Sequence, residues 1–360
     1  MDKKVYWVGF NYVKGVGPMR LRALLNFFGD IQIAWEAPSD ALRAAGLSQK
    51  IIDNLLHVRT HLDIQKEIER ATAGGIDILT WDDSAYPKKL LEIHQPPPVL
   101  YVRGSFQPED EIAVAIVGTR RITPYGRRVT VQLSERLAQN GVTVISGLAR
   151  GVDGVSHQAA LNAGGRTIAV LGSGIDQIYP PEHRGLAEKI VQNGAVVSDY
   201  SPGTPPEAVN FPPRNRIISG LSSGTVVVEA GKKSGALITA TFAVEQGREV
   251  FAVPGSIHGV QSRGTNYLIQ QGARPLLDPE ELLEFLNLEV VEKRRSARKA
   301  LPGDEFEKQI LQVLGQDPLH IDEIGRLAGL PIEKVSSTLT LMELKGLVQQ
   351  AGVMSYILAD

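Results

Sequence analysis

Residues 142–153 read VTVISGLARGVD, an apolar run that leads directly into a glycine-rich loop and then into the start of a helix. Strands that are buried on both faces of a parallel sheet are nearly continuous apolar runs. Glycines after such a strand let the backbone come close to a ligand. This stretch therefore predicts one strand-loop-helix unit of an α/β sheet, with its strand at Val142–Ser146.

The same pattern recurs along residues 111–288. Five further apolar runs predict strands, and helical segments of roughly ten to fifteen residues separate most of them. These runs are Ala113–Val117, Thr167–Leu171, Val196–Ser198, Thr225–Glu229 and Glu249–Val253. Strands that alternate with helices are typical of a doubly wound, Rossmann-like parallel sheet, so we expect an α/β fold here.

Two smaller modules and two connecting segments complete the expected domain organisation. A tight turn at 15–17 precedes Pro18 and the helical spacing of residues 19–28. Residues 1–61 therefore predict a helical module of the helix-hairpin-helix or SAM-like type. Such a turn either offers backbone N–H groups to a phosphate or simply joins two helices of a bundle. Residues 62–110 are expected to form a connector, with a strand at 99–102.

The C-terminal segment, residues 305–360, predicts a winged helix that follows a basic linker at 289–304. Three helices and a hairpin of two strands are expected. They lie at Phe306–Leu314, Ile321–Ala328, Pro331–Lys345, Val348–Gln350 and Met354–Leu358. The module holds four basic and eight acidic residues, and this charge is unfavourable for duplex DNA.

Composition excludes several classes of protein and of site. Of 360 residues, 43% are hydrophobic and 22% are charged, as in an ordinary globular protein. The absence of cysteine excludes disulfides, thiol nucleophiles and cysteine-ligated zinc. The first residues do not resemble a signal peptide, and no apolar run approaches the ~18 residues of a membrane span. We therefore expect a cytoplasmic protein without membrane association.

Glycine and cationic residues follow the expected strands. These loops are Gly118-Thr119-Arg120, Ser146-Gly147-Leu148-Ala149-Arg150-Gly151, Gly172-Ser173-Gly174 and Gly231-Lys232-Lys233-Ser234-Gly235. Ligands of open α/β sheets bind at the carboxyl ends of the strands, and helix N-termini favour anions there. We expect an anion pocket in which Arg120, Arg150, Lys232 and Lys233 supply the cations.

Known nucleotide and metal motifs do not account for this pocket. Neither the GxGxxG fingerprint nor the Walker motif is present. No cofactor and no metal site are therefore expected.

Two pairs of residues allow more than one interpretation. Arg214 and Arg216 lie on different sides of a short helix, so we expect one to reach phosphate and the other to pair internally, with Glu229 or Asp153. Asp153 and His157 are one helical turn apart. They could act together in acid–base catalysis. We favour the alternative, in which Asp153 caps the helix and His157 is packed or contacts phosphate.

With these motifs in view, the sequence resembles the DprA (Smf) family of DNA-processing proteins. The matching motifs span residues 80–275 in the family's order. They are Tyr86-Pro87, Pro97-Pro98-Val99-Leu100-Tyr101, Val117-Gly118-Thr119-Arg120, Ser146 to Asp153 with His157, Tyr179-Pro180, Arg214 to Ser222, Ser234 to Thr239 and Val253-Pro254-Gly255. The N-terminal and C-terminal modules also match the longer family members.

The resemblance implies single-stranded DNA binding, a homodimer, and loading of RecA recombinase during natural transformation, by a protein that is not an enzyme. It places a DNA-contacting Arg at Arg120 and the dimer contact, with RecA docking nearby, at Val244 and Ile269. Alternatively, both apolar residues fill the monomer core. Pro181 stands where the family often has Lys, so Arg184 is a candidate to supply that charge.

The residues expected to bind DNA or phosphate come from the loops after the strands and from the Arg214–Arg216 segment. They are Gly118, Thr119, Arg120, Ser146, Gly147, Arg150, Gly151, Asp153, His157, Gly172, Gly174, Arg184, Arg214, Asn215, Arg216, Lys232, Lys233, Ser234, Gly235 and Thr239.

Two other functions compete with this interpretation. Rossmann-like nucleotide phosphoribohydrolases also combine glycine loops with a carboxylate, but residues 229–235 depart from their PGGxGT-type loop. A regulator that acts through the winged helix would have to use a recognition helix with only Lys334 and Lys345 against Glu333 and Glu343. Docking of a protein fits that module better.

Overall fold

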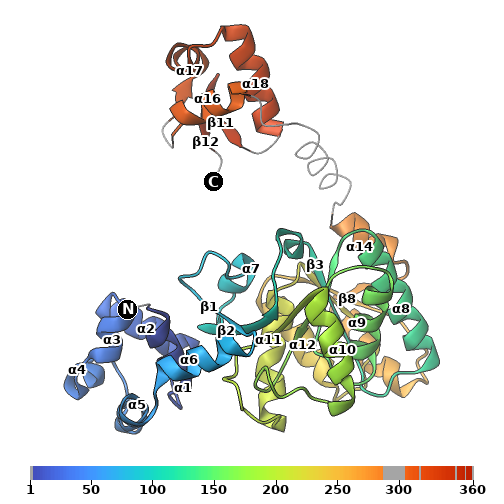
Figure 1. Ribbon diagram of the computed structural model, residues 1–360. Helices are drawn as coiled ribbons and strands as arrows, with labels where there is room; N and C mark the ends of the chain where they lie inside the picture. The colour runs from blue at the N-terminus through green and yellow to red at the C-terminus, as the bar shows by residue number, and fades with distance from the viewer. Residues whose placement is uncertain (1–2, 287–304, 316–317, 345–346, 353, 359–360) are drawn as a thin grey trace. The chain divides into compact units, whose positions relative to one another are not determined.

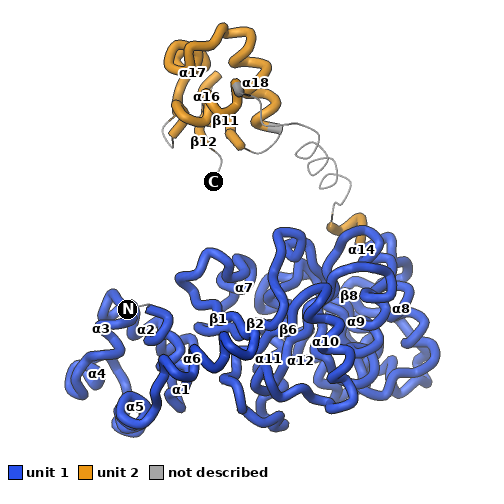
Figure 2. The backbone as a smooth tube through the Cα atoms, viewed as in Figure 1, with its two compact units in different colours: residues 1–282 blue, residues 283–360 orange. Residues whose placement is uncertain are grey.

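The computed structural model divides the chain into two compact units, residues 1–282 and 283–360 (Figure 2). It describes residues 3–286, 305–315, 318–344, 347–352 and 354–358. The basic linker predicted at 289–304 lies outside the described residues.

A nine-stranded sheet forms the centre of the first unit (Figure 1). Its order is β1-β2-β6-β5-β4-β3-β7-β8-β9. The strands are β1 Asp77–Thr80, β2 Val99–Gly104, β3 Ala113–Val117, β4 Thr143–Ser146, β5 Thr167–Val170, β6 Gly194–Ser198, β7 Gly224–Val227, β8 Glu249–Ala252 and β9 Arg274–Pro275. All six strands predicted between 111 and 288 are confirmed, with ends that differ by at most a few residues.

Strand β3 lies in the middle of the sheet, and later strands are added first on one side of it and then on the other. β4, β5 and β6 follow on one side, whereas β7, β8 and β9 return on the other. β3 pairs in parallel with β4 and with β7. The strand order therefore reverses between β3 and β7, and in α/β folds such a reversal is where ligands bind, outside the carboxyl ends.

The connector at 62–110 contributes to this sheet. β2 pairs antiparallel with β6, and β1 pairs antiparallel with β2. β2 was predicted, but β1 was not, because its four residues are too short to show a clear alternation of burial. The connector thus extends the parallel sheet by two antiparallel strands.

Helices cover the sheet in two groups. Crossovers between parallel strands are right-handed, so strands added on opposite sides of β3 place their helices on opposite faces of the sheet. Helix α9 packs against α8 and α10, and α11 packs against α12. The helices and 3-10 turns of this part are α7 Lys88–Leu91, η1 Pro108–Glu111, α8 Pro124–Gln139, α9 Val152–Asn162, η2 Pro181–His183, α10 Arg184–Gln192, η3 Ala208–Asn210, α11 Phe211–Gly220, α12 Gly235–Glu245, η4 Val260–Ser262, α13 Arg263–Gln270 and α14 Glu280–Phe285.

Six helices precede the sheet, and two of them, α1 and α6, pack against its antiparallel extension. They are α1 Lys4–Tyr12, α2 Pro18–Phe28, α3 Ile31–Glu36, α4 Ser39–Ala44, α5 Gln49–His61 and α6 Ile64–Ala73. Trp7 donates a hydrogen bond from Nε1 to Asp82 Oδ2 over 2.9 Å. Buried Trp7 and Phe10 share one hydrophobic cluster with Val99 and Tyr101. The predicted helix at 19–28 and the turn before Pro18 are confirmed, but phosphate contact at that turn stays a prediction.

The second unit has the expected winged-helix architecture. Its described elements are α16 Glu305–Val313, β10 Leu319–His320, α17 Ile321–Ala328, α18 Ile332–Leu344, β11 Val348–Gly352 and β12 Ser355–Leu358. The three strands form a sheet in the order β10-β12-β11. Buried Ile324, Val335 and Leu339 hold the helices together. Among the residues that the model describes, no helix has the length and apolar character needed to cross a membrane.

Candidate functional site

A groove of about 790 Å³ lies at the point where the strand order reverses. The loops after β3 and β7 form two of its walls, as expected for the carboxyl edge of a parallel sheet. Predicted residues that line it are Gly118, Thr119, Arg120, Asp153, Arg214, Asn215, Lys233, Ser234, Gly235 and Thr239. The fold thus brings together residues that are up to 121 positions apart in the sequence, from 118 to 239.

A small hollow continues this groove past Tyr179. It shares Arg120, Tyr179 and Phe211 with the groove and adds Gly147 and Arg150. The loop after β4, which was the starting point of the sequence interpretation, therefore reaches the same surface as the loops after β3 and β7.

Arg214 and Asp153 form a buried support under this loop. The Arg214 guanidinium is 4% exposed and donates to the carbonyls of Gly147 and Val170. The Asp153 carboxylate accepts from the backbone N–H groups of Gly147 (3.2 Å) and Ala149 (3.3 Å). Burial lowers the pKa of Arg214 to about 10, and burial also raises the pKa of Asp153 although Arg214 opposes that shift.

These contacts correct the predicted role of Asp153. Helix α9 begins at Val152, and its N-cap is Gly151, so Asp153 lies in the first turn and does not cap the helix. Gly151 has a φ of 78°, which only glycine adopts without strain. A side chain at Gly147 would begin 2.7 Å from the Arg214 guanidinium. Glycine is therefore needed at both positions to shape the loop.

His157 is fully buried, so we withdraw it as a phosphate ligand and as a catalytic partner of Asp153. Its Nδ1 lies 2.6 Å from Thr167 Oγ1, and that hydroxyl already donates its proton to the Val144 carbonyl. His157 must therefore donate from Nδ1. Burial lowers its pKa to about 3, and the ring is neutral.

Both guanidinium groups of Arg214 and Arg216 make contacts inside the protein, and the carboxylate partner predicted for the internal arginine is corrected, whereas phosphate contact by Arg214 stays a prediction. Arg216 donates to Asp199 Oδ2 over 2.9 Å, and neither Glu229 nor Asp153 is its partner. Glu229 instead accepts from the Thr123 backbone N–H (2.9 Å) at the start of α8. Arg214 lines the groove as a fixed positive charge, whereas Arg216 does not line it.

Several cations at the groove are exposed. The Arg120 guanidinium carbon lies 5.5 Å from the centre of the Phe211 ring, and among the described residues Arg120 forms no ion pair. Lys233 lines the groove beside it, and Lys232 is exposed next to Lys233. Arg150 is exposed too, but its Nε lies 2.5 Å from Glu182 Oε1. A phosphate would have to compete with this carboxylate for Arg150.

Two aromatic residues in the groove were not predicted as site residues. Phe211 and Tyr179 are partly buried, with ring centres 5.7 Å apart. Arg120 and Arg214 both lie over the Phe211 ring. Phe211 and Tyr179 each stand directly before a proline and close in sequence to a cationic motif. This placement was the only sign in the sequence that the two rings take part in binding.

The N-terminus of α12 faces the groove. Ser234 caps it by accepting from the Ala236 N–H (3.3 Å), and Asn215 Nδ2 donates to the Gly235 carbonyl over 3.3 Å. Ser234, Gly235 and Thr239 all line the groove. The N–H groups of this helix start favour an anion at that place.

The remaining predicted residues lie outside the groove and the hollow. Ser146 is buried, and its hydroxyl donates to the Ile116 carbonyl. Gly172 packs against the Phe211 ring, so it supports that ring without reaching a ligand. Gly174 donates to the Thr204 carbonyl, and Arg184 is exposed at the start of α10. We therefore do not retain Ser146, Gly172 and Gly174 as direct ligands.

Val244 and Ile269 differ in exposure. Val244, on α12, is 67% exposed, which corrects the alternative that it fills the monomer core. Ile269, on α13, is partly buried, and its neighbour Tyr267 is 53% exposed. Exposed Val260 and Ile238 add apolar surface from η4 and α12.

Two family models match the sequence. "DNA recombination-mediator protein A" matches residues 77–287, and "DprA winged helix domain" matches residues 294–352. Protein Smf of Synechocystis is 37% identical over 99% of this chain and 98% of its own length. DNA processing protein DprA of Bacillus subtilis is 44% identical over 59% of this chain and 72% of its own length.

Two solved structures are similar to this one. DNA processing protein A from Streptococcus pneumoniae has 32% identity and a TM-score of 0.69, covering 79% of this chain and 97% of that one. DNA processing protein A from Helicobacter pylori, described for its unique single-stranded DNA binding mode, has 32% identity and a TM-score of 0.53. It covers 60% of this chain and 97% of that one. The resemblance drawn from the motifs is confirmed.

Proposed function

Because this chain belongs to the DNA recombination-mediator protein A family, which includes proteins named DprA and Smf, we propose that it binds single-stranded DNA in the groove between β3 and β7 and loads RecA onto it. This activity would serve DNA uptake in natural transformation and recombination. The names of the relatives, which are DNA processing proteins, support the first part of this proposal. The recombinase partner rests on the family resemblance alone.

The exposed Arg120 above the Phe211 ring is the observation that carries the proposal. Arg120 and Lys233 supply mobile cations for phosphates, and the N-terminus of α12 supplies fixed N–H donors. Phe211 and Tyr179 supply apolar faces for bases. Cations along a groove with aromatic side chains in it are the usual arrangement for binding single strands.

The same arrangement favours single strands over duplexes. A base can stack on Phe211 only when it has left its own stack, and this costs less energy in a single strand than in a duplex, where base pairing must also be broken. Since every base offers a π face, the groove is expected to bind with little sequence preference. Contacts with phosphates position the strand, and aromatic rings stack on any base. Neither kind of contact requires hydrogen bonds to the edges of the bases.

We also propose that the chain forms a homodimer through Val244 on α12 and Ile269 on α13. An isologous interface would place two grooves on one particle, so that a single strand could occupy both. The 67% exposure of Val244 supports this proposal, since an apolar side chain that is not needed in the core is available for a partner.

We propose that the protein is a binding protein and not an enzyme. Asp153 holds a loop through two backbone N–H groups, and His157 is buried and neutral, so this pair is not available for acid–base chemistry. Incubation with nucleoside monophosphates should release no free base. Release of base at a rate proportional to protein concentration would support the phosphoribohydrolase alternative.

Equilibrium binding of single- and double-stranded oligonucleotides at several salt concentrations tests the main proposal. Single strands should bind more tightly, and Arg120→Ala should weaken their binding and reduce the slope of log K against log salt by ~0.7, the value for one phosphate contact. Arg128→Ala is the matched control, because Arg128 is exposed on α8 and does not line the groove. An unchanged slope in folded Arg120→Ala protein would contradict the proposed site.

A further inference from the structure

A second cavity, of about 370 Å³, lies at the opposite edge of the sheet from the groove. Glu111 stands just before β3 and Leu221 just before β7, so the cavity is near the amino ends of these strands, whereas the groove is at their carboxyl ends. Its volume falls in the range typical of small-molecule sites, roughly 300–1,000 Å³.

The interior of this cavity is apolar. Side chains from four strands, from the segment after β2 and from the residue after α11 line it: Leu79, Val102, Phe106, Ile145, Ile168 and Leu221. Val102, Ile145 and Ile168 are buried behind this lining, whereas Leu79 and Phe106 pack against the same hydrophobic cluster and are partly exposed. An apolar body would therefore lose water on entry and contact a rigid wall.

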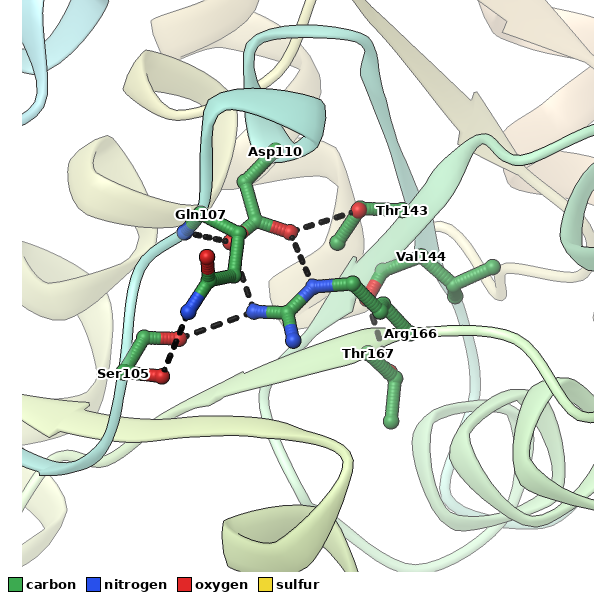
Figure 3. Close-up of polar contacts among 7 residues, drawn as sticks. All are labelled: Ser105, Gln107, Asp110, Thr143, Val144, Arg166 and Thr167. Atoms are coloured by element: carbon green, nitrogen blue, oxygen red, sulfur yellow. Dashed lines mark hydrogen bonds and ion pairs between the residues drawn. The ribbon is translucent and has the colours of Figure 1, made fainter.

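The loop on one side of the cavity is fixed in place by Asp110 (Figure 3). The Asp110 carboxylate accepts from Thr143 Oγ1 (2.7 Å), from Arg166 Nε (2.9 Å) and from the Gln107 backbone N–H (2.8 Å). Arg166 also donates to the Ser105 carbonyl. These bonds tie the loop to the starts of β4 and β5, so the cavity is held open before any ligand arrives.

Lys89 supplies a cation without a carboxylate partner on the cavity wall. Its Nζ donates to the Glu111 carbonyl (2.5 Å) and to Ser223 Oγ (2.5 Å). An ammonium group has three N–H donors, so one is left. Burial, assisted by Arg248, lowers the pKa of Lys89 although Glu111 and Glu92 oppose that shift.

Carboxylates also line this cavity, but none neutralises Lys89. Asp110 is committed to Arg166, while Asp77 and Glu111 are exposed to solvent. Within the part of the chain that the structure describes, Lys89 forms no ion pair with any of them. Lys88, exposed beside it, adds a second positive charge to the lining.

We propose that this cavity is a second ligand site, which binds a small amphipathic carboxylate with its apolar body against Leu79 and Phe106 and its carboxylate on Lys89. The free acid and the C-terminal residue of a peptide share this chemistry. A charge-assisted hydrogen bond from a half-buried ammonium explains why an acid is preferred to a neutral analogue.

Titration calorimetry of the full chain with 3-phenylpropionate, 4-methylpentanoate and the peptide acetyl-Gly-Gly-Phe tests this site. At least one probe should bind, and its amide should bind about tenfold more weakly, a difference of about 1.4 kcal/mol. Tighter binding of the peptide than of the free acids would identify a peptide C-terminus as the source, and the reverse would identify a free acid.

Two variants locate the site, and both should keep the fold. Lys89→Met should abolish the preference for the acid over the amide, whereas Lys66→Met, at an exposed position on α6, should not. Ala85→Trp, at an exposed lining position, should block binding of all probes while single-stranded DNA binding stays unchanged. The proposal is overturned if no probe binds at millimolar concentration, if Lys89→Met keeps the preference for the acid over the amide, or if binding persists in Ala85→Trp.

Discussion

The groove of the first unit and the winged helix of the second both belong to structural classes that bind nucleic acids, but they use their cations differently. In the groove, Arg214 is buried as a support, and Arg120 is thereby left exposed over Phe211. In the winged helix, the Lys334 ammonium lies 5.0 Å from the centre of the Phe306 ring, and Arg326 lies 3.5 Å from Glu323. The comparison teaches that the availability of a cation, rather than the number of cations, distinguishes a phosphate site from a solvated surface.

The largest expected effect comes from the buried cation of the groove. Arg214→Met removes the donor to two carbonyls and takes away the stronger of the two positive charges, Arg214 and Arg120, that act on the buried Asp153 carboxylate. We expect the free energy of unfolding to fall by ~3 kcal/mol. Urea unfolding monitored by tryptophan fluorescence measures this loss, because all three tryptophans, Trp7, Trp35 and Trp81, lie in the first unit.

Lys334→Met is the matched change in the winged helix. It removes only an exposed contact with an aromatic ring, so a loss of ~0.5 kcal/mol is expected, measured by circular dichroism. If Arg214→Met and Lys334→Met lowered the free energy of unfolding equally, the contrast between a buried supporting cation and an exposed surface cation would be wrong.

An intermediate effect is expected at exposed apolar residues of the two units. Val244→Arg on α12 should convert a dimer into folded monomers with weaker single-strand binding, since an unpaired charge in an apolar interface is costly. Leu327→Arg, at a residue that is 53% exposed on α17, should leave the oligomeric state unchanged. Light scattering with circular dichroism tests both variants. A folded Val244→Arg dimer would count against the proposed interface.

The smallest effect on single-strand binding is expected from removing the winged helix. A chain without residues 289–360 should bind single-stranded DNA with an affinity within about tenfold of the full chain, a limit of about 1.4 kcal/mol. The reason is the acidic character of residues 305–360. A larger loss, measured on the same oligonucleotide at the same salt concentration, would move part of the DNA-binding surface to the second unit.

The sequence predicted the elements of the sheet well and the roles of individual polar residues less well. The six predicted strands, β3 to β8, are apolar runs next to glycine loops, and both features are local in the sequence. The partner of Arg216 is Asp199, and the carboxylate of Asp153 binds backbone N–H groups. Neither contact could be predicted, because each depends on which side chains the crossovers bring together.

The second cavity shows the same limit of sequence reasoning. Lys89 and Ser223 are far apart in the chain and meet only because α11 ends beside the segment around α7. In the sequence, Lys89 simply precedes Leu90 and Leu91 in the short helix α7, and nothing in this pattern predicts that its side chain is partly buried. The exposure of Val244 was equally hidden, since residues 235–245 are apolar on nearly every side.

The position of β3 has a consequence for how the chain is made. β3 is the first parallel strand to leave the ribosome, yet one of its two neighbours is β7, with Val114 opposite Gly224. At 5–20 residues per second, the interval between the synthesis of these two strands is on the order of ten seconds. One edge of the central strand stays open throughout that time, and its AVAIV sequence can pair with other chains. The strand reversal that creates the groove thus also creates a period during synthesis in which one edge of the central strand waits for its partner.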